Sequence, residues 1–223
     1  MATPHLLFPR WSNHLVRAIL GAVGIGGGLL VAFAFSYFRS PLFTRQNEPI
    51  DQPVEFDHRH HVRDHGIDCR FCHTTVEKGE SAGYPPTEVC GSCHGQVWNK
   101  SPYLASIRTS LFTGKPLEWV RVNDLRDYVY FNHSIHVNKG VGCVTCHGRV
   151  DEMAAVHKAT PMNMGWCLDC HRNPTPNLRP REFITSMTWQ PKAEAGETAE
   201  SVGQQVVQQN NVHTRESCST CHR

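Results

Sequence analysis

The sequence lacks several features that mark common classes of protein. Its lysines and arginines are scattered and form no basic run, so nucleic-acid binding is not indicated. Hydrophobic residues make up only 39% of the 223 residues, and several of them lie in one N-terminal stretch, which leaves little apolar material for a conventional core. No cysteine lies outside a repeated five-residue pattern, so the chain has no spare thiol for a separate disulfide framework.

All ten cysteines belong to five copies of Cys-x-x-Cys-His. Two thiols at this spacing reach the two vinyl groups of one haem as thioethers, and the next histidine falls beneath the iron as an axial ligand. Zinc sites and disulfides are the alternatives, but neither requires a histidine directly after every second cysteine. The sequence therefore predicts five covalently bound haem c groups and a core built largely from porphyrin. The predicted attachment residues are Cys69, Cys72, Cys90, Cys93, Cys143, Cys146, Cys167, Cys170, Cys218 and Cys221, and the predicted axial ligands are His73, His94, His147, His171 and His222.

An uncharged stretch near the N-terminus, residues 18–38, is long enough to cross a bilayer as a helix. A cleaved signal peptide, with an A-x-A site at residues 32–34, is the alternative. We expect a single-pass transmembrane anchor, because the segment is still present in this chain. Gly24 and Gly28 form a G-x-x-x-G pair that suits close packing against another membrane helix, although a glycine-rich anchor also tolerates such a pair without a partner.

A repeated segment organises the rest of the chain. The run FDHRHH at 56–61 precedes the first motif much as FNHSIH at 131–136 precedes the third. The second motif follows the first, and the fourth follows the third, so each run is followed by two motifs. This repeat predicts two tandem di-haem modules within residues 39–173 and a fifth haem at the end of residues 174–223. Because the stretch 174–211 is rich in proline, then glutamine, and lacks apolar periodicity, we expect an extended arm there. Elsewhere we expect short helices at the motifs, joined by loops, with little or no β-sheet, and hence a mainly α and irregular fold.

The sixth coordination position of each iron decides whether a haem carries electrons or binds substrate. The shared pattern F-x-H-x-x-H predicts distal ligands, since two histidines three residues apart present their imidazoles from one helical face toward two irons. His60 and His65 have no counterpart in the second repeat, and we interpret them as propionate partners or surface residues. The four predicted distal histidines are His58, His61, His133 and His136.

One haem still needs a distal ligand. Met153, six residues after the third motif, is the first choice, and ligation by a methionine would give that haem the highest potential of the five. Packing against a porphyrin is the alternative role for a thioether in such an interior. The remaining candidates, in order, are Met164, His157 and His213.

The stretch from Phe56 to His171, which contains FDHRHH, YPPTEVCGSCH, WVRVNDLRDYVYFNHSIH and MGWCLDCHR, resembles the class III multihaem cytochrome c family. With the anchor and the fifth motif, the chain is most similar to the membrane-anchored pentahaem cytochrome c subunits of bacterial alternative complex III. The resemblance implies a hetero-oligomeric complex with an iron-sulfur subunit, polytopic quinol-binding membrane subunits and a mono-haem cytochrome c. It also implies haem attachment outside the cytoplasm, which puts residues 1–17 in the cytoplasm and the haem domain on the periplasmic face of the bacterial inner membrane.

The resemblance further implies which histidines share an iron. The first histidine of each F-x-H-x-x-H would serve the haem that follows it, so that His58 would pair with His73. In the same way, His133 would pair with His147. The second histidine of each pattern would cross to another haem and so tie the modules together.

The favoured hypothesis is an electron-transfer wire that passes electrons from quinol and iron-sulfur partners to a periplasmic acceptor or terminal oxidase, with no substrate chemistry of its own. A self-sufficient anchored multihaem quinol dehydrogenase is one alternative, but about thirty residues separate the anchor from the first motif. A multihaem oxyanion reductase is another. Such enzymes need an open iron position, often marked by a lysine in place of the proximal histidine, whereas all five motifs end in histidine.

Overall fold

The computed structural model describes residues 8–9 and 11–222. They belong to two compact units, Met1–Arg45 and Gln46–Arg223. The predicted cytoplasmic segment, residues 1–17, lies partly outside the described residues. All five Cys-x-x-Cys-His motifs belong to the second unit.

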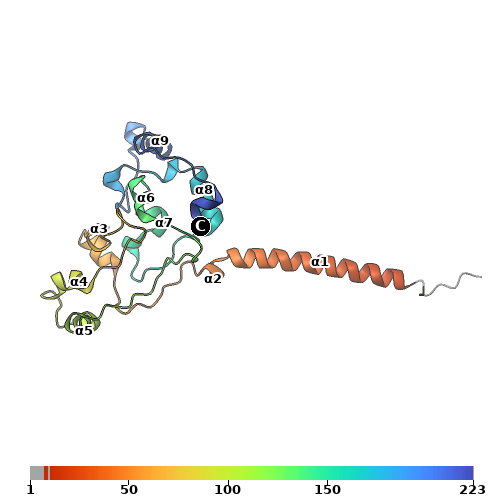
Figure 1. Ribbon diagram of the computed structural model, residues 1–223, viewed down its shortest axis with the longest axis horizontal. Helices are drawn as coiled ribbons and strands as arrows, with labels where there is room; N and C mark the ends of the chain where they lie inside the picture. Colours follow the sequence, from red (N-terminus) through yellow and green to blue (C-terminus); the bar gives the residue numbers. More distant parts are fainter. Residues whose placement is uncertain (1–7, 10, 223) are drawn as a thin grey trace, which may run out of the picture. The chain divides into compact units, whose positions relative to one another are not determined.

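The first unit consists of helix α1, Ser12–Arg39, and the single turn α2, Pro41–Thr44 (Figure 1). Helix α1 contains the whole uncharged stretch. With an 18-residue window of mean hydropathy 2.2, it is long and apolar enough to span a membrane, as the sequence predicts. The helix ends at Arg39 because Ser40 precedes Pro41, and the residue before a proline prefers extended backbone. The hydroxyl of Ser40 donates to the carbonyl of Tyr37 (2.7 Å), which satisfies one of the last helical acceptors.

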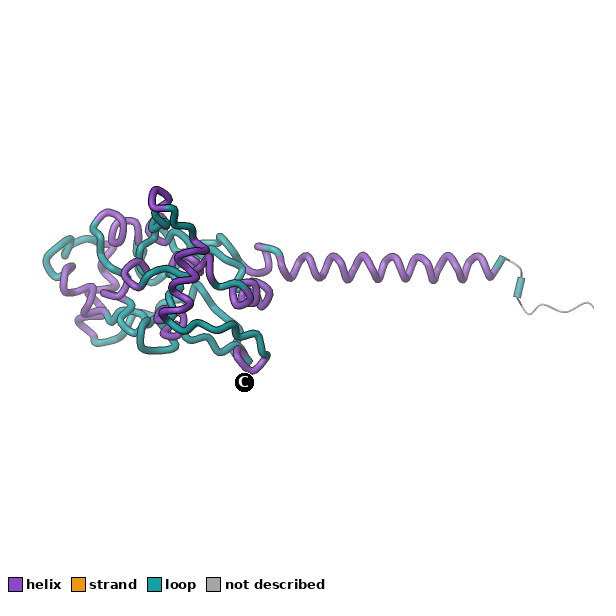
Figure 2. The backbone as a smooth tube through the Cα atoms, turned by 90° about the horizontal axis from the view of Figure 1, so that it is seen from above, coloured by secondary structure: helices purple, strands orange, loops and turns teal. Residues whose placement is uncertain are grey.

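The second unit consists of short helices and turns joined by long loops (Figure 2). Among the described residues no β-strand occurs, and pairing of extended backbone is limited to isolated bridges such as Val141 with Leu178. The prediction of a mainly α and irregular fold with little or no sheet is confirmed. In chain order the elements are the π-helix η1 (Arg59–Asp64), α3 (Cys69–Cys72), α4 (Thr87–His94), η2 (Pro102–Leu104), α5 (Ala105–Thr113), α6 (His133–Asn138), α7 (Cys143–His147), η3 (Val150–Glu152), α8 (Met164–Arg172), η4 (Thr175–Asn177), η5 (Arg181–Phe183), η6 (Ala193–Ala195), α9 (Ala199–Gln209) and α10 (Cys218–Cys221).

Each motif lies in a helical turn, as the sequence predicts. The first, third and fifth motifs make up almost all of α3, α7 and α10, while the second and fourth lie in the C-terminal parts of α4 and α8. The turn closes when the histidine N–H donates to the carbonyl of the first cysteine, as in His73 to Cys69 (2.8 Å) and His222 to Cys218 (2.9 Å). Residues three apart share a helical face, so the turn brings both thiols of a motif to one side.

Among the described residues, buried hydrophobic side chains form two small clusters. One centres on Leu104 and Ile107, at the start of α5, and contacts Cys90 of the second motif. The other centres on Leu178 and Val206 and joins η4 to α9. Outside the clusters, Val137, Met153 and Ile184 are buried singly. Clusters of this size agree with the low apolar content of the sequence.

Helix α9 contradicts one expectation from the sequence. Residues 174–211 are not an extended arm throughout, because Ala199–Gln209 form a helix. Thr198 and Ser201 build a capping box at its start, and Val206 is buried with 2% exposure against η4. A Cβ on Gly203 would overlap the carbonyl of Thr175, so this glycine lets α9 lie directly on the η4 backbone.

Candidate functional site

Three pairs of histidines place their imidazole rings at one common separation. Iron–nitrogen bonds of about 2 Å on opposite sides of one iron put the two ring centroids about 6 Å apart. The observed separations fit one iron held between two imidazoles in each pair. The pairs are His61 with His94 (6.1 Å), His133 with His147 (6.3 Å) and His136 with His171 (6.1 Å).

His58, the fourth predicted distal histidine, lies directly before η1. Burial lowers the pKa of His58 to about 4, and a charge on His73 is the next largest cause of the shift. Among the described residues the buried Nδ1 atom of His58 has no hydrogen-bond partner. Its ring is not among the three pairs above, and its pairing with His73 stays a prediction of the resemblance.

The phenylalanine of each F-x-H-x-x-H segment packs against both histidines of that segment. The ring of Phe56 stacks on His61 at 4.2 Å and meets His58 edge-on at 4.7 Å. Phe131 makes the same two contacts in the second repeat, at 4.4 Å and 4.8 Å. The sequence repeat is therefore a repeat of side-chain geometry as well, with the aromatic ring fixing where two imidazoles point.

Hydrogen bonds fix the tautomer of the motif histidines. A carbonyl oxygen only accepts, so each ring nitrogen bonded to one carries the proton and leaves Nε2 free to bind a metal. The Nδ1–H of His73 donates to Gly83 (2.8 Å), that of His94 to Val97 (3.1 Å), that of His171 to Arg215 (2.7 Å) and that of His222 to Tyr128 (3.0 Å). The distal candidates His61, His133 and His136 donate in the same way to Asp57, Glu80 and Asn132.

His147 of the third motif differs in having a side chain as partner. Its Nδ1 lies 3.0 Å from the amide nitrogen of Asn123, while the amide oxygen of Asn123 is buried and unpaired. Turning the amide round lets Nδ1–H of His147 donate to the Asn123 oxygen and satisfies both groups. Sequence reasoning did not single out Asn123, because a lone asparagine in a long loop carries no recognisable signal.

Burial favours the neutral imidazoles that bind metals. It lowers the pKa of His147 to about 4 and also lowers the pKa of His61, His133 and His136. The ten cysteines are all unpaired, and burial raises the pKa of Cys146 to about 12. Among the described residues no group of three or more His, Cys, Asp or Glu side chains has the arrangement of a separate metal site. The neutral imidazoles, each facing a second imidazole, are the feature that fits haem attachment.

Arg179 is a second residue that sequence reasoning missed. Its guanidinium lies against Gly142, directly before the third motif, and packs 5.3 Å from the centroid of the Trp189 ring. One of its nitrogens donates to the carbonyl of Ser186 (3.0 Å), but Nε is buried and has no hydrogen-bond partner among the described residues. A buried cation with a free N–H beside a predicted haem site fits an anionic haem propionate.

The candidates for the fifth distal ligand lie in different places. Met153 is buried, with 8% exposure, and its methyl group faces Gly148 beside the third motif. Met164 is the first residue of α8 and is 67% exposed. His157 pairs its backbone with Pro49. The fourth candidate, at position 213, follows α9 in the loop that leads to the fifth motif.

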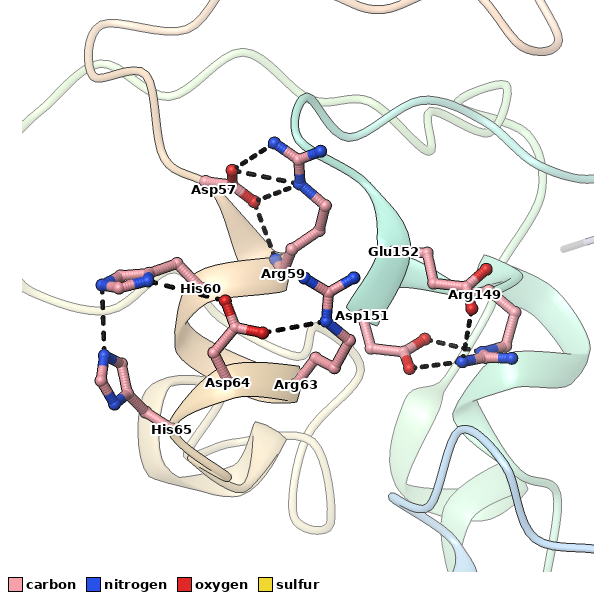
Figure 3. Close-up of polar contacts among 9 residues, drawn as sticks. All are labelled: Asp57, Arg59, His60, Arg63, Asp64, His65, Arg149, Asp151 and Glu152. Atoms are coloured by element: carbon pink, nitrogen blue, oxygen red, sulfur yellow. Dashed lines mark hydrogen bonds and ion pairs between the residues drawn. The ribbon is translucent and has the colours of Figure 1, made fainter.

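His60 in η1 and His65 directly after it are exposed, and Figure 3 shows their rings facing each other. Their Nε2 atoms are 3.1 Å apart, and Nδ1 of His60 is 3.8 Å from Asp64. Because η1 is a π-helix, residues five apart come together, which the sequence pattern did not indicate. Figure 3 also shows η3 beside η1, where Arg149 forms an ion pair with Asp151 (2.7 Å).

Comparisons with known proteins agree with this geometry. Residues 129–223 match the family model described as cytochrome c7 and related cytochrome c. The multihaem cytochrome c subunit of a menaquinone reductase from Nitratidesulfovibrio vulgaris is 34% identical over 128 residues, which are 57% of this chain and 59% of that protein. The chain therefore matches less than two thirds of the length of this relative. The fold and these similarities therefore agree with haem attachment at the motifs, and residues 129–223 are similar to the cytochrome c7 family.

Proposed function

We propose that this chain binds five haem c groups, one at each motif, and acts as an electron-transfer wire in a membrane quinol-oxidising complex. The pairing of imidazoles is the observation that carries the proposal. Three histidines from the F-x-H-x-x-H segments lie at iron-bridging distance from histidines of three motifs. With both axial positions filled, an iron exchanges electrons and has no position left for a substrate.

Each distal pair serves two sites. His58 and His61 would ligate at the first and second motifs, and His133 and His136 at the third and fourth. When bound, each haem supplies a centre that is reduced and reoxidised by one electron. The hydrogen bonds at Nδ1 hold the ligating rings in place, so the ligand set changes little with oxidation state.

The fifth site takes His222 and, we propose, a methionine. Met153 is the first choice from the sequence, but its methyl group lies near Gly148, directly after the third motif. Met164 is the first residue of α8, and this helix contacts the segment before the fifth motif, where Nδ1–H of His171 donates to the carbonyl of Arg215 (2.7 Å) and Arg172 pairs with Glu216 (3.1 Å). We therefore propose Met164 as the better candidate, because its helix, unlike the turn that holds Met153, contacts this segment.

The complex is proposed from two similarities. The resemblance to alternative complex III supports an iron-sulfur subunit, polytopic quinol-binding subunits and a mono-haem cytochrome c as partners, with α1 as anchor and the haem domain on the periplasmic face. The relative from Nitratidesulfovibrio vulgaris is named for menaquinone reduction, which is the opposite direction of electron flow. Electron delivery to a quinone is therefore the second candidate function.

Purification in mild detergent tests the proposal. We expect five haems per chain by mass spectrometry, low-spin spectra throughout, and co-purifying iron-sulfur and polytopic subunits. Added quinol should reduce the haems of the complex. If the haems are first reduced by another donor and added quinone then reoxidises them, electron delivery to a quinone is favoured instead. An isolated chain that oxidises quinol would support the self-sufficient dehydrogenase, and stoichiometric high-spin haem would support the oxyanion reductase.

A further inference from the structure

Arg179 is a buried arginine without an acidic partner. It is 9% exposed and is the one buried lysine or arginine in the part of the chain that the structure describes. Elsewhere in the second unit arginines pair with carboxylates, as Arg59 does with Asp57 (2.7 Å). No such ion pair holds Arg179 among the described residues, and burial lowers its pKa below the usual value. Because an arginine stays protonated in proteins, Arg179 brings a positive charge into the interior of this unit.

Contacts on several sides hold the guanidinium of Arg179. One of its terminal nitrogens donates to the carbonyl of Ser186 (3.0 Å), and its central carbon lies 5.3 Å from the centroid of the Trp189 ring. The ring of Trp189 is itself stacked on Phe183 at 5.6 Å. The backbone N–H of Arg179 donates to the carbonyl of Gly140 (2.9 Å), which fixes the start of the side chain. The positive charge therefore stays at one point of the fold.

Gly142, directly before the first cysteine of the third motif, leaves the space that this guanidinium fills. A Cβ at position 142 would overlap Nε and the central carbon of Arg179. The backbone of Gly142 has φ −72° and ψ 143°, which any residue adopts, so space and not conformation requires a glycine there. The N–H of Cys143 also donates to the carbonyl of Ile184 (3.0 Å), which ties the segment 179–186 to this motif. The buried charge therefore lies against the third motif.

A fixed positive charge beside a haem changes the free energy of its reduction. Reduction adds one electron to the haem, so a nearby cation stabilises the reduced form relative to the oxidised form and raises the potential. Salt screens buried charges only weakly, and the effect therefore persists at an ionic strength that removes the effect of surface charges. Donation from the free Nε–H of Arg179 to a haem propionate acts in the same direction, because it offsets the negative charge of that group.

We propose that Arg179 raises the potential of the haem at the third motif through its buried charge, and that Gly142 is a glycine because it has to admit this side chain. Arg181, two residues further along the chain, has no such role, since 71% of its side chain is exposed and water screens its charge. This inference rests on the proposed function, because it needs a haem at the third motif. It adds a residue outside the motifs and their predicted ligands that makes one haem easier to reduce.

Potentiometric titration of the haem-loaded complex, followed by absorbance and electron paramagnetic resonance, tests the inference. His147→Met changes the axial ligand at the third motif alone and so identifies the titration component of that haem. Arg179→Gln removes the charge and should lower the potential of this component, at low and at high salt. Arg179→Lys keeps the charge and should leave the potential close to its original value. The matched control Arg181→Gln, in the same segment, should shift no component.

Equal shifts in Arg179→Gln and Arg179→Lys would show that the arginine acts through packing and not through charge, and would overturn the inference. A shift confined to another haem, or no shift, would overturn it as well. If Arg179→Gln does not assemble with five haems, Gly142→Ala replaces it, because the added Cβ displaces the guanidinium and should lower the same potential by a smaller amount. An unchanged potential in Gly142→Ala would then refute the inference.

Failure of this inference and failure of the proposed function give different results. Five low-spin haems whose potentials do not respond to Arg179→Gln would refute only the role of Arg179. Missing or high-spin haems in the unaltered protein would refute the proposed function itself.

Discussion

Asn123 offers a direct test of how the protein tunes one haem site. The other motif histidines donate to backbone carbonyls, which substitution of a side chain cannot remove. His147 faces the side chain of Asn123 at 3.0 Å instead. Asn123→Ala therefore deletes the hydrogen-bond partner of one proposed axial ligand and leaves the partners of the other four motif histidines unchanged.

The expected effect is a rise in the potential of the haem at the third motif. An acceptor at Nδ1 makes the imidazole a stronger donor to iron and stabilises the oxidised state, so its loss favours the reduced state. The net contribution of one hydrogen bond is about 0.5–1.5 kcal/mol. Converted at about 2.3 kcal/mol per 100 mV, it gives an expected rise in the potential of about 20–65 mV. Asn123→Asp places a carboxylate there and should shift the potential in the opposite direction.

Potentiometric titration of the purified haem-loaded protein, followed by absorbance and electron paramagnetic resonance, measures these shifts. One haem should move upward in Asn123→Ala and downward in Asn123→Asp, with the other four unchanged. The same sign in both variants would contradict an amide oxygen turned toward His147. A shift confined to a different haem would contradict the proposed ligation at the third motif.

The remaining predictions concern ligands and packing. In electron paramagnetic resonance, His61→Ala should give one high-spin haem at the second motif, whereas the control His60→Ala should leave all five haems low-spin. High-spin haem in both variants would contradict the assignment of His61 as a ligand and His60 as a surface residue. Met164→Leu should abolish the methionine–iron charge-transfer absorption and Met153→Leu should retain it, and the reverse result would return the fifth ligand to Met153. Gly203→Val should lower the free energy of unfolding by about 1–3 kcal/mol, because the side chain overlaps the backbone of η4; an unchanged thermal midpoint would contradict the close packing.

The sequence predicts the local parts of each site because they depend on spacing alone. A motif of five residues closes one helical turn whatever surrounds it, as the hydrogen bond from His73 to Cys69 shows. The repeated F-x-H-x-x-H segment also predicts that its histidines face motif histidines. The paired rings of His133 and His147 are an example, although haem ligation by them stays a prediction.

Features that depend on distant contacts could not be predicted. Helix α9 contains few apolar residues, and its position depends on burying Val206 against Leu178 and on the missing side chain of Gly203. The location of Met153 beside Gly148 follows from a turn after the third motif, which no periodicity indicates. In both cases the contact joins residues whose proximity depends on the folded chain, so the sequence alone does not predict it.

Haem removal is the prediction that depends most on the whole fold. The hydrophobic clusters around Ile107 and Leu178 are small, and Nε of Arg179 and Nδ1 of His58 are buried polar groups without a partner in the part of the chain that the structure describes. Unpaired buried polar groups destabilise a fold, and these two have haem groups as their proposed partners. A variant with all ten cysteines changed to serine should therefore lose the cooperative thermal transition of the haem-loaded protein, as followed by circular dichroism. A retained transition would mean that the polypeptide packs without porphyrin, and the buried imidazole pairs would then need another explanation.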